Sequence, residues 1–494
     1  MKKLLTLVVA LGVVLGSLGA ASAIDVKVNG QWWFWYSYAT NPLLVKKDDT
    51  GKHADRVRAR QRTRVQIQFI ADENLSALLN LENNIHWGDS GKGTGPANSY
   101  GAINADNSTF VIKRAHLDWT IPNTQVKTRM GVQGINLPGA SIWNPVLNAD
   151  VAGVSVSNQF TPEFGLTAFW ARPYDRNYYD DTTQADGKNE LDDMDVFGVI
   201  LPIKTDVVRF SPWAIAAVIG KDSDFFSNKL NYNGASINSV AATQPTWNPA
   251  GTAVTKAGKA AIAAKGDRDD QAYGWWIGTT FELPVLDPFF VKLDGMYGRV
   301  DTGDSDYDMS GWMVAGDIGY KFSFGSLSAI GFYSSGNDDD DDFGQLPIIS
   351  ADGAFNMSNA LYGLAGASWR RWDGYLSNTG QGMWGMGIKI ADVSFVDNLK
   401  HTLTGMWYGG TNKGDSVDNK RSVRAGANNT FGERQLTTSD HAWEVNLVNE
   451  YKVNENLSFR FDVGYIQLEL GDSWTDKDDT KGNFLTGVGV QYMF

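Results

Sequence analysis

The chain contains no cysteine, which excludes a disulfide scaffold, thiol catalysis and cysteine-ligated metal sites. After residue 23 it also lacks any apolar run of about 18 residues, so no transmembrane helix is expected. Basic residues are in deficit, with 43 Lys and Arg against 56 Asp and Glu. This acidity argues against nucleic acid as a partner. The five histidines show no metal-ligand spacing.

Residues 1–23 are typical of a secretory signal peptide. A basic head with Lys2 and Lys3 precedes an apolar run, and Ala21-Ser22-Ala23 is an A-x-A cleavage signature. An uncleaved membrane anchor is the alternative, but the apolar run is short for a membrane span. Cleavage leaves residues 24–494, and the loss of two lysines changes the net charge from −13 to −15. With no linker or break in composition, we expect one domain over residues 24–494.

The most informative stretch is residues 57–69, in which four arginines alternate with mostly apolar residues. Side chains alternate between the two faces of a strand, so one face is cationic and the other is fairly apolar, with Gln61 as the long polar exception. A helix would scatter the arginines around its axis and leave no apolar stripe. The pattern therefore predicts a strand with Arg58, Arg60, Arg62 and Arg64 on one face.

The same period-two alternation continues and predicts eighteen strands. They cover residues 26–38, 57–69, 75–87, 114–121, 126–133, 152–160, 164–171, 196–201, 207–220, 272–283, 289–300, 311–322, 327–334, 382–390, 399–409, 442–453, 457–470 and 483–494. Every second connection is tight, and the others are long and polar. This pattern predicts an all-β, transmembrane, antiparallel up-and-down β-barrel of 16–18 strands, with 18 favoured, short periplasmic turns and long outer loops.

Two alternatives to a transmembrane barrel fit less well. A soluble propeller or β-solenoid would repeat a motif at a fixed period, and none is present. A soluble barrel would need a filled apolar core, and eighteen strands enclose too much space for side chains to fill. The apolar face is therefore expected to point outward and the polar face to line water. On the lipid face each arginine would cost about 2–4 kcal/mol at the bilayer midplane, which places the four arginines in the lumen.

Neighbouring strands extend this basic wall with Arg114, His116, Lys127 and Arg129. Glu82 and Asp118 are expected to pair with one or two of the basic residues and to leave an excess of positive charge. The last strand ends in aromatic residues, Tyr492 and Phe494, on its apolar face. This ending resembles the C-terminal signal by which the bacterial outer-membrane assembly machinery recognises its substrates.

With these features, the chain resembles the homotrimeric general porins of Gram-negative outer membranes, and more narrowly the porins of sulfate-reducing bacteria. The resemblance implies a trimer in which the first strands and residues 88–108 lie near the subunit contacts. It also implies that the loop after the fifth strand, residues 136–150, folds into the pore and forms the constriction. That loop offers Asn144, Asn148 and a single acid, Asp150, so a net cationic constriction is expected.

The resulting hypothesis is a non-enzymatic outer-membrane channel for passive diffusion of small hydrophilic solutes, with a preference for organic acids or inorganic oxyanions. A substrate-specific channel for a sugar or a carboxylate is the alternative, which Trp33 and Trp35 on the polar face of the first strand support. An outer-membrane protease or lipase would need a catalytic set, and no convincing Ser/His/Asp arrangement appears. No cofactor is expected.

Acidic clusters occur in the predicted outer loops, including five consecutive aspartates at residues 338–342. Asp304, Asp306 and Asp308 alternate in a short loop and could hold Ca²⁺, although the EF-hand glycine and terminal Glu are absent. Solvated acidic loops are the simpler interpretation, and divalent ions bridging to lipopolysaccharide are the other. The expected partners are the lipid bilayer, lipopolysaccharide, further copies of the chain, the assembly machinery and small anionic or neutral solutes.

Overall fold

The computed structural model describes residues 24–41, 44, 55–88, 100–101, 110–175, 193–221, 223–227, 246–247, 254–256, 271–303, 308–338, 343–350, 357–358, 379–414, 436–474 and 477–494. One 20-stranded sheet dominates this part of the chain. Two of its members, β4 (Tyr100–Gly101) and β10 (Ile203–Lys204), are two-residue strands, so eighteen strands form the wall. The predicted strand count is confirmed.

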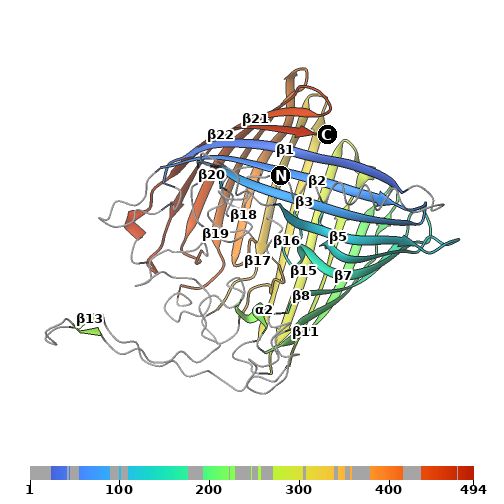
Figure 1. The fold of residues 1–494 in the computed structure, drawn as a ribbon. Helices are drawn as coiled ribbons and strands as arrows, with labels where there is room; N and C mark the ends of the chain where they lie inside the picture. Colours follow the sequence, from blue (N-terminus) through green and yellow to red (C-terminus); the bar gives the residue numbers. More distant parts are fainter. Residues whose placement is uncertain are drawn as a thin grey trace.

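The wall strands follow one another in chain order, and each is antiparallel to the next (Figure 1). They are β1 (Asp25–Ala39), β2 (Arg56–Ile70), β3 (Leu75–Trp87), β5 (Val111–Thr120), β6 (Lys127–Asn136), β7 (Asn148–Gln159), β8 (Gly165–Tyr174), β9 (Met194–Ile200), β11 (Arg209–Gly220), β14 (Gln271–Glu282), β15 (Phe289–Asp301), β16 (Met309–Phe322), β17 (Gly325–Ser334), β18 (Met383–Val396), β19 (Leu399–Gly410), β20 (His441–Lys452), β21 (Leu457–Glu469) and β22 (Asn483–Met493).

Small elements that the alternation did not predict lie between the wall strands. A helical turn, α2 (Asp224–Ser227), and the hairpin of β12 (Thr246–Trp247) and β13 (Val254–Lys256) follow β11. Among the described residues, no helix is long and apolar enough to cross a membrane.

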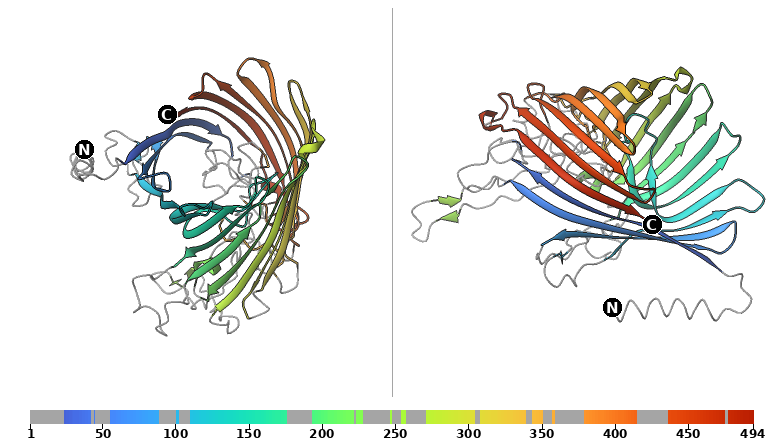
Figure 2. Two further views of the ribbon diagram at one scale, coloured as in Figure 1. Left: turned by 90° about the vertical axis from the view of Figure 1, so that its right-hand side faces the viewer. Right: turned by 90° about the horizontal axis from the view of Figure 1, so that it is seen from above.

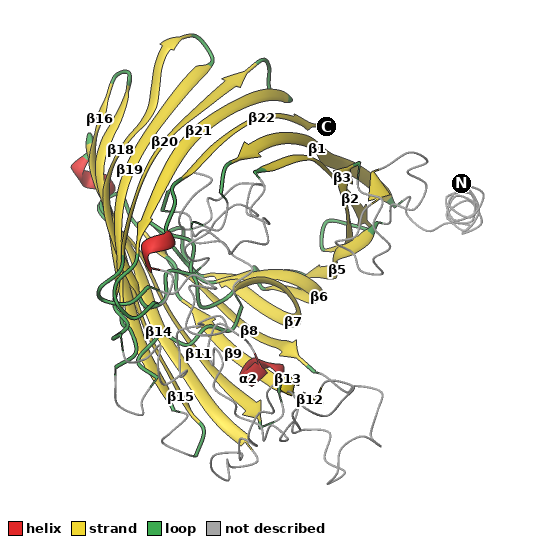
Figure 3. Cartoon of the chain, turned by 90° about the vertical axis from the view of Figure 1, so that its left-hand side faces the viewer, coloured by secondary structure: helices red, strands yellow, loops and turns green. Residues whose placement is uncertain are grey.

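The barrel closes where β22 pairs with β1 (Figures 2 and 3). At this seam, Gly30 and Phe494 exchange two backbone hydrogen bonds, of 2.7 and 3.0 Å. A Cβ at Gly30 would lie 2.7 Å from the Phe494 ring, so glycine leaves the space that the terminal ring occupies. Closure gives every wall strand two neighbours, as hydrocarbon surroundings require.

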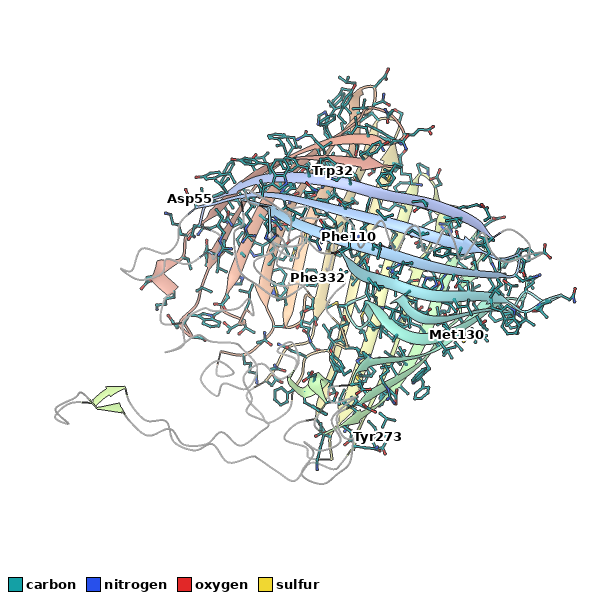
Figure 4. All side chains as sticks on the ribbon, viewed as in Figure 1. Trp32, Asp55, Phe110, Met130, Tyr273 and Phe332 are labelled. Atoms are coloured by element: carbon teal, nitrogen blue, oxygen red, sulfur yellow. The ribbon has the colours of Figure 1, made fainter. Side chains whose placement is uncertain are left out.

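The outward face is apolar and carries two aromatic belts. In β16, Trp312 near the long loops and Phe322 near the short turns both point outward. These residues are ten positions apart, which corresponds to roughly 25 Å along the membrane normal at a strand tilt near 40°. The exposed side chains of Met130 and Tyr273 belong to the same outer surface (Figure 4). The distance between the belts matches the apolar band of transmembrane barrels.

Candidate functional site

The connection between β6 and β7, residues 137–147, crosses the interior of the barrel and is called the constriction loop below. It follows the fifth wall strand, and its tip reaches β15, six wall strands further round the ring. The connection is shorter than the sequence indicated, because β7 begins at Asn148 instead of near residue 152.

Asp294 of β15 holds the tip of the constriction loop. Its carboxylate accepts backbone N–H bonds from Ala140 (2.8 Å), Ser141 (2.6 Å) and Ile142 (3.1 Å), and a 2.6 Å bond from the Ser141 hydroxyl. Asp294 is only 4% exposed. Four donors on one buried carboxylate form a strong anchor, because bonds to an ionised acceptor are about twice as strong as neutral ones.

Inside the loop, Asn144 has a structural role that differs from the predicted one. Its amide nitrogen donates to the Pro138 carbonyl at 3.0 Å, and its amide oxygen accepts from the Val146 N–H at 3.0 Å. The side chain is 2% exposed and braces the loop internally instead of facing the lumen. Trp143, which the sequence did not single out, is 40% exposed and is the large apolar side chain that the loop presents.

A second inward segment, residues 343–350, lies against the constriction loop. The Ile349 N–H donates to the Val146 carbonyl at 2.9 Å. Trp276 of β14 donates to the Pro347 carbonyl at 2.8 Å, and Tyr174 of β8 donates to the Ile349 carbonyl at 2.7 Å. Leu346, Ile348 and Ile349 are fully buried. The two loop segments together fill the part of the lumen that borders β8 to β16.

The opposite part of the wall carries the arginine strand, now β2. Arg60 and Arg62 lie in register with Trp35 and Trp33 of β1, on the face opposite the exposed Val57. The Arg62 guanidinium stacks over the Trp33 ring at 4.9 Å, within cation–π range. Arg60 is only 4% exposed, so it is packed within the wall more than it is open to the lumen.

Glu82 is the one acidic residue of β2 and β3, and it lies between two of the arginines. Its carboxylate accepts a 2.5 Å bond from Arg64 Nε and lies 3.6 Å from Arg62 Nε. Asn84 completes the group by donating to Glu82 at 2.7 Å and accepting from Arg62. Within β2 and β3, this single carboxylate stands against the five arginines of β2, Arg56, Arg58, Arg60, Arg62 and Arg64, so these two strands together carry a net positive charge.

A second polar group lies on the inward face of β5 and β6. Asp118 accepts bonds from Arg129 at 2.6 and 2.9 Å, and His116 Nδ1 lies 3.5 Å from the same carboxylate. Asp118 and Arg129 border a side cavity of about 480 Å³ that Lys127, Gln133, Ser155 and Thr167 also line. These polar groups suit a hydrated small solute.

Asp150 and Arg114 form a separate ion pair at the outer-loop end of this wall. Asp150 belongs to the series of β7 that points outward with Ala152 and Val156, because the strand alternation already applies from Asn148 onward. Arg114 Nε donates to Asp150 at 2.5 Å, and Lys113 pairs with the same carboxylate. Asp150 therefore does not supply the acidic side of a constriction, and Asn148 is part of the strand. The Arg114 guanidinium lies beside Gly134, the outward register partner of Asp150, so Arg114 does not extend the lumenal basic wall as predicted. Arg62, Arg64, Arg114 and Arg129 all have acidic partners, more than the one or two expected.

At the short-turn end, the lumen opens into a vestibule of about 1320 Å³. Its charges are largely paired: Lys389 with Asp317 at 2.6 Å, and Lys321 with Asp287 at 2.7 Å. The vestibule is therefore close to electrically balanced, in contrast to the β2 wall.

The proposed Ca²⁺ loop is described only at Asp308; Asp304 and Asp306 lie outside the described residues. The Asp308 carboxylate accepts the Thr302 N–H at 2.8 Å and lies 3.4 Å from Arg299 Nη2. In the part of the chain that the structure describes, no group of three or more potential metal ligands comes together.

Replacing Gly311 of β16 by alanine is expected to displace the inward segment. The added Cβ would lie 2.3 Å from backbone atoms of Gln345 and Leu346, which cannot rotate away. We expect a loss of about 1–3 kcal/mol in the free energy of unfolding, together with a higher single-channel conductance. Gly295→Ala is the control, because a Cβ there meets no atom within 4 Å. Equal conductance in the two variants would contradict a constricting role for the segment.

No protein-family model and no curated protein sequence matches the chain. Solved structures do resemble it: Pseudomonas aeruginosa OccK8 (OprE) at TM-score 0.51, with 95% of this chain and 98% of that chain covered, and a BenF-like porin from Pseudomonas fluorescens Pf-5 at 0.52 with the same coverages. Acinetobacter baumannii OccAB3 reaches 0.50 and covers 95% and 99%. Each is 10% identical in sequence. The likeness therefore shows that the chain has the fold of these barrels, a closed antiparallel β-barrel of eighteen strands.

Proposed function

We propose that the chain is an outer-membrane channel through which small hydrophilic solutes diffuse passively, with a preference for anions. The observation that carries this proposal is the cationic inner face of β2 in a closed barrel, opposite two loop segments that narrow the lumen. The positive charge of this face attracts anions into the lumen and repels cations. The proposed solutes are organic acids and inorganic oxyanions.

The second candidate is a substrate-specific channel of the same architecture. Two observations favour it: Trp143 is exposed on the constriction loop, and Trp33 lies beneath Arg62. An aromatic ring beside a guanidinium suits a carboxylate attached to an apolar body. Among the structural neighbours, one is named a BenF-like porin, one the outer membrane protein opdK and one OccAB3.

The remaining features of the proposal come from the sequence. They are export through the signal peptide of residues 1–23, residence in a Gram-negative outer membrane, a homotrimeric assembly, contacts with lipid and lipopolysaccharide, and recognition by the assembly machinery through Tyr492 and Phe494. The proposed role is non-enzymatic and needs no cofactor, and a structural Ca²⁺ in the acidic outer loops is kept as a secondary proposal.

Reversal potentials across a salt gradient in planar bilayers test the anion preference. For the double variant Arg60→Ala/Arg62→Ala we expect a clear shift toward cations, because two of the five arginines of β2 are lost while Glu82 remains. The matched control, Lys321→Ala/Lys400→Ala, removes two charges from the vestibule rim, where each lysine already faces an aspartate. A cation-selective wild type, or equal shifts in both double variants, would contradict the arginine assignment.

Uptake assays distinguish the two candidates. Liposome swelling rates that fall smoothly with solute size, for sugars and organic anions alike, would support a general diffusion channel. Saturable uptake of one carboxylate class, lost in Trp143→Ala, would support the specific channel.

A further inference from the structure

The outer wall beside the seam of the barrel carries an apolar groove of about 350 Å³. It runs across β19 to β22 and β1, and its lining includes Phe34, Leu399, Tyr451, Phe461, Val488 and Val490. Tyr451, Phe461 and Val488 are 44–47% exposed, so the groove opens on the outward face and not into the lumen. At roughly 30 Å³ for a water-sized group, it has room for about a dozen methylene-sized groups.

A polar pair interrupts this otherwise apolar surface. His401 of β19 lies outward between Leu399 and Leu403, and its Nδ1 is 2.6 Å from Asn449 Oδ1. Asn449 of β20 lines the groove, and its Nδ2 donates to the Phe461 carbonyl at 3.0 Å. The second bond fixes the Asn449 amide with its oxygen toward the histidine, so His401 Nδ1 carries the proton.

The other nitrogen of the ring, Nε2, is then a hydrogen-bond acceptor when the imidazole is neutral. None of the described residues hydrogen-bonds to it. An acceptor without a donor on a lipid-facing surface is unfavourable, because hydrocarbon offers no substitute for water. The surface therefore combines an apolar trough with one acceptor beside it, which matches an amphipathic ligand whose polar end is a hydrogen-bond donor.

The position of the pair along the strands indicates which leaflet supplies the ligand. His401 is two residues, or about 7 Å, from the start of β19 at the short-turn end. Asn449 is four residues from Val453 in the turn after β20, which is roughly 10 Å along the normal for a tilted strand. Short turns of such barrels face the periplasm, so the pair lies near the boundary between head groups and hydrocarbon in the periplasmic leaflet.

We propose that this groove binds one acyl chain of a phospholipid whose head group donates a hydrogen bond to His401, as the ammonium of phosphatidylethanolamine does. The inference rests on the proposed membrane location, which puts the outward face in lipid. A second copy of the chain is the competing occupant. A stable interface needs about 800 Å² from each partner, and the first strands, which the proposed trimer places near its contacts, reach this groove only through Phe34 of β1.

Competition between two head groups tests the proposal. Full-length barrel is reconstituted in vesicles of equal parts phosphatidylethanolamine and phosphatidylcholine, extracted, and analysed by native mass spectrometry for retained lipid. Phosphatidylcholine has no N–H to donate, so we expect about five-fold preferential retention of phosphatidylethanolamine, the equivalent of one net hydrogen bond of about 1 kcal/mol. His401→Leu should abolish this preference, and His401→Gln, which keeps an acceptor, should retain part of it.

His441→Leu is the matched control, because His441 begins β20 at the opposite, outer-loop end of the same strand pair. This variant should keep the wild-type preference. Equal retention of both lipids by the wild type, or the same preference in His401→Leu, would overturn the proposal, as would dimerisation that depends on His401. Bilayer conductance measured on the same samples distinguishes failure of the lipid-binding inference from failure of the proposed channel function. A barrel that inserts and conducts but shows no lipid preference refutes only this inference, whereas a barrel that does not insert refutes the proposed function.

Discussion

Replacing Asp294 by alanine is expected to raise the single-channel conductance and to make the current noisy, because the constriction loop loses its anchor on β15. The substitution removes four hydrogen bonds to a buried carboxylate. At about 1.5–3 kcal/mol for each bond to a charged group, the loss is at least about 6 kcal/mol before the loop relaxes. A difference of about 5.5 kcal/mol already moves a two-state equilibrium from 1:99 to 99:1.

The loop keeps its second attachment, the bonds from the Ile349 and Ser350 N–H groups to the Val146 carbonyl, so flickering between positions is expected instead of one fixed open state. Planar-bilayer recordings of wild type, Asp294→Ala and Asp317→Ala make the comparison. Asp317 is also an inward, buried carboxylate, one strand further on, but it pairs with Lys389 and does not touch the loop. If Asp317→Ala opened the channel as much as Asp294→Ala, the effect would come from lost lumenal charge and not from the anchor.

The wall strands of the barrel could be predicted from the sequence because the alternation that marks them arises within each strand. Each strand has one lipid-facing side, so apolar residues recur at every second position, as in the 14 residues of β16. The arginines of β2 were assigned to a face for the same reason. His401 between Leu399 and Leu403 is a visible break in that alternation, and it could have been noticed from the sequence.

The anchor of the constriction loop could not be predicted. Asp294 binds backbone N–H groups, which every residue except proline carries, so its partners leave no trace in residue types. The sequence suggested Asp150 as the acid of this region, but that choice depended on where the loop ends. Because β7 begins at Asn148 and not near residue 152, Asp150 lies on the strand, and the strand alternation places it on the outward face.

The inward segment at residues 343–350 had a detectable signal. It carries Leu346 to Ile349, a short apolar run that begins four residues after the last of five aspartates in a long polar connection. Such a run in a loop has to be buried somewhere, and in this fold the lumen receives it.

Replacing Phe494 by alanine is expected to reduce strongly the amount of assembled barrel in cells while leaving refolding in vitro nearly intact. The backbone bonds between residue 494 and Gly30, at one end of the seam, survive the substitution. The ring stacks on Tyr492 with a centroid distance of 5.8 Å, and such a contact is worth only about 0.5–1.5 kcal/mol beyond its burial. A large cellular defect would therefore reflect lost recognition by the assembly machinery more than lost stability.

Three measurements separate these contributions. Heat-modifiable gel mobility of outer-membrane fractions reports assembly in cells, and the same assay after refolding into lipid vesicles reports intrinsic folding. Phe484→Ala removes an equally large outward ring, 39% exposed, from the start of the same strand and should assemble normally. Deleting residue 494 also removes both backbone bonds to Gly30, at one end of the seam, so this variant should be impaired in both assays. If Phe494→Ala fails to refold without the machinery, the terminal ring acts mainly by closing the seam, and the recognition role proposed for it is contradicted.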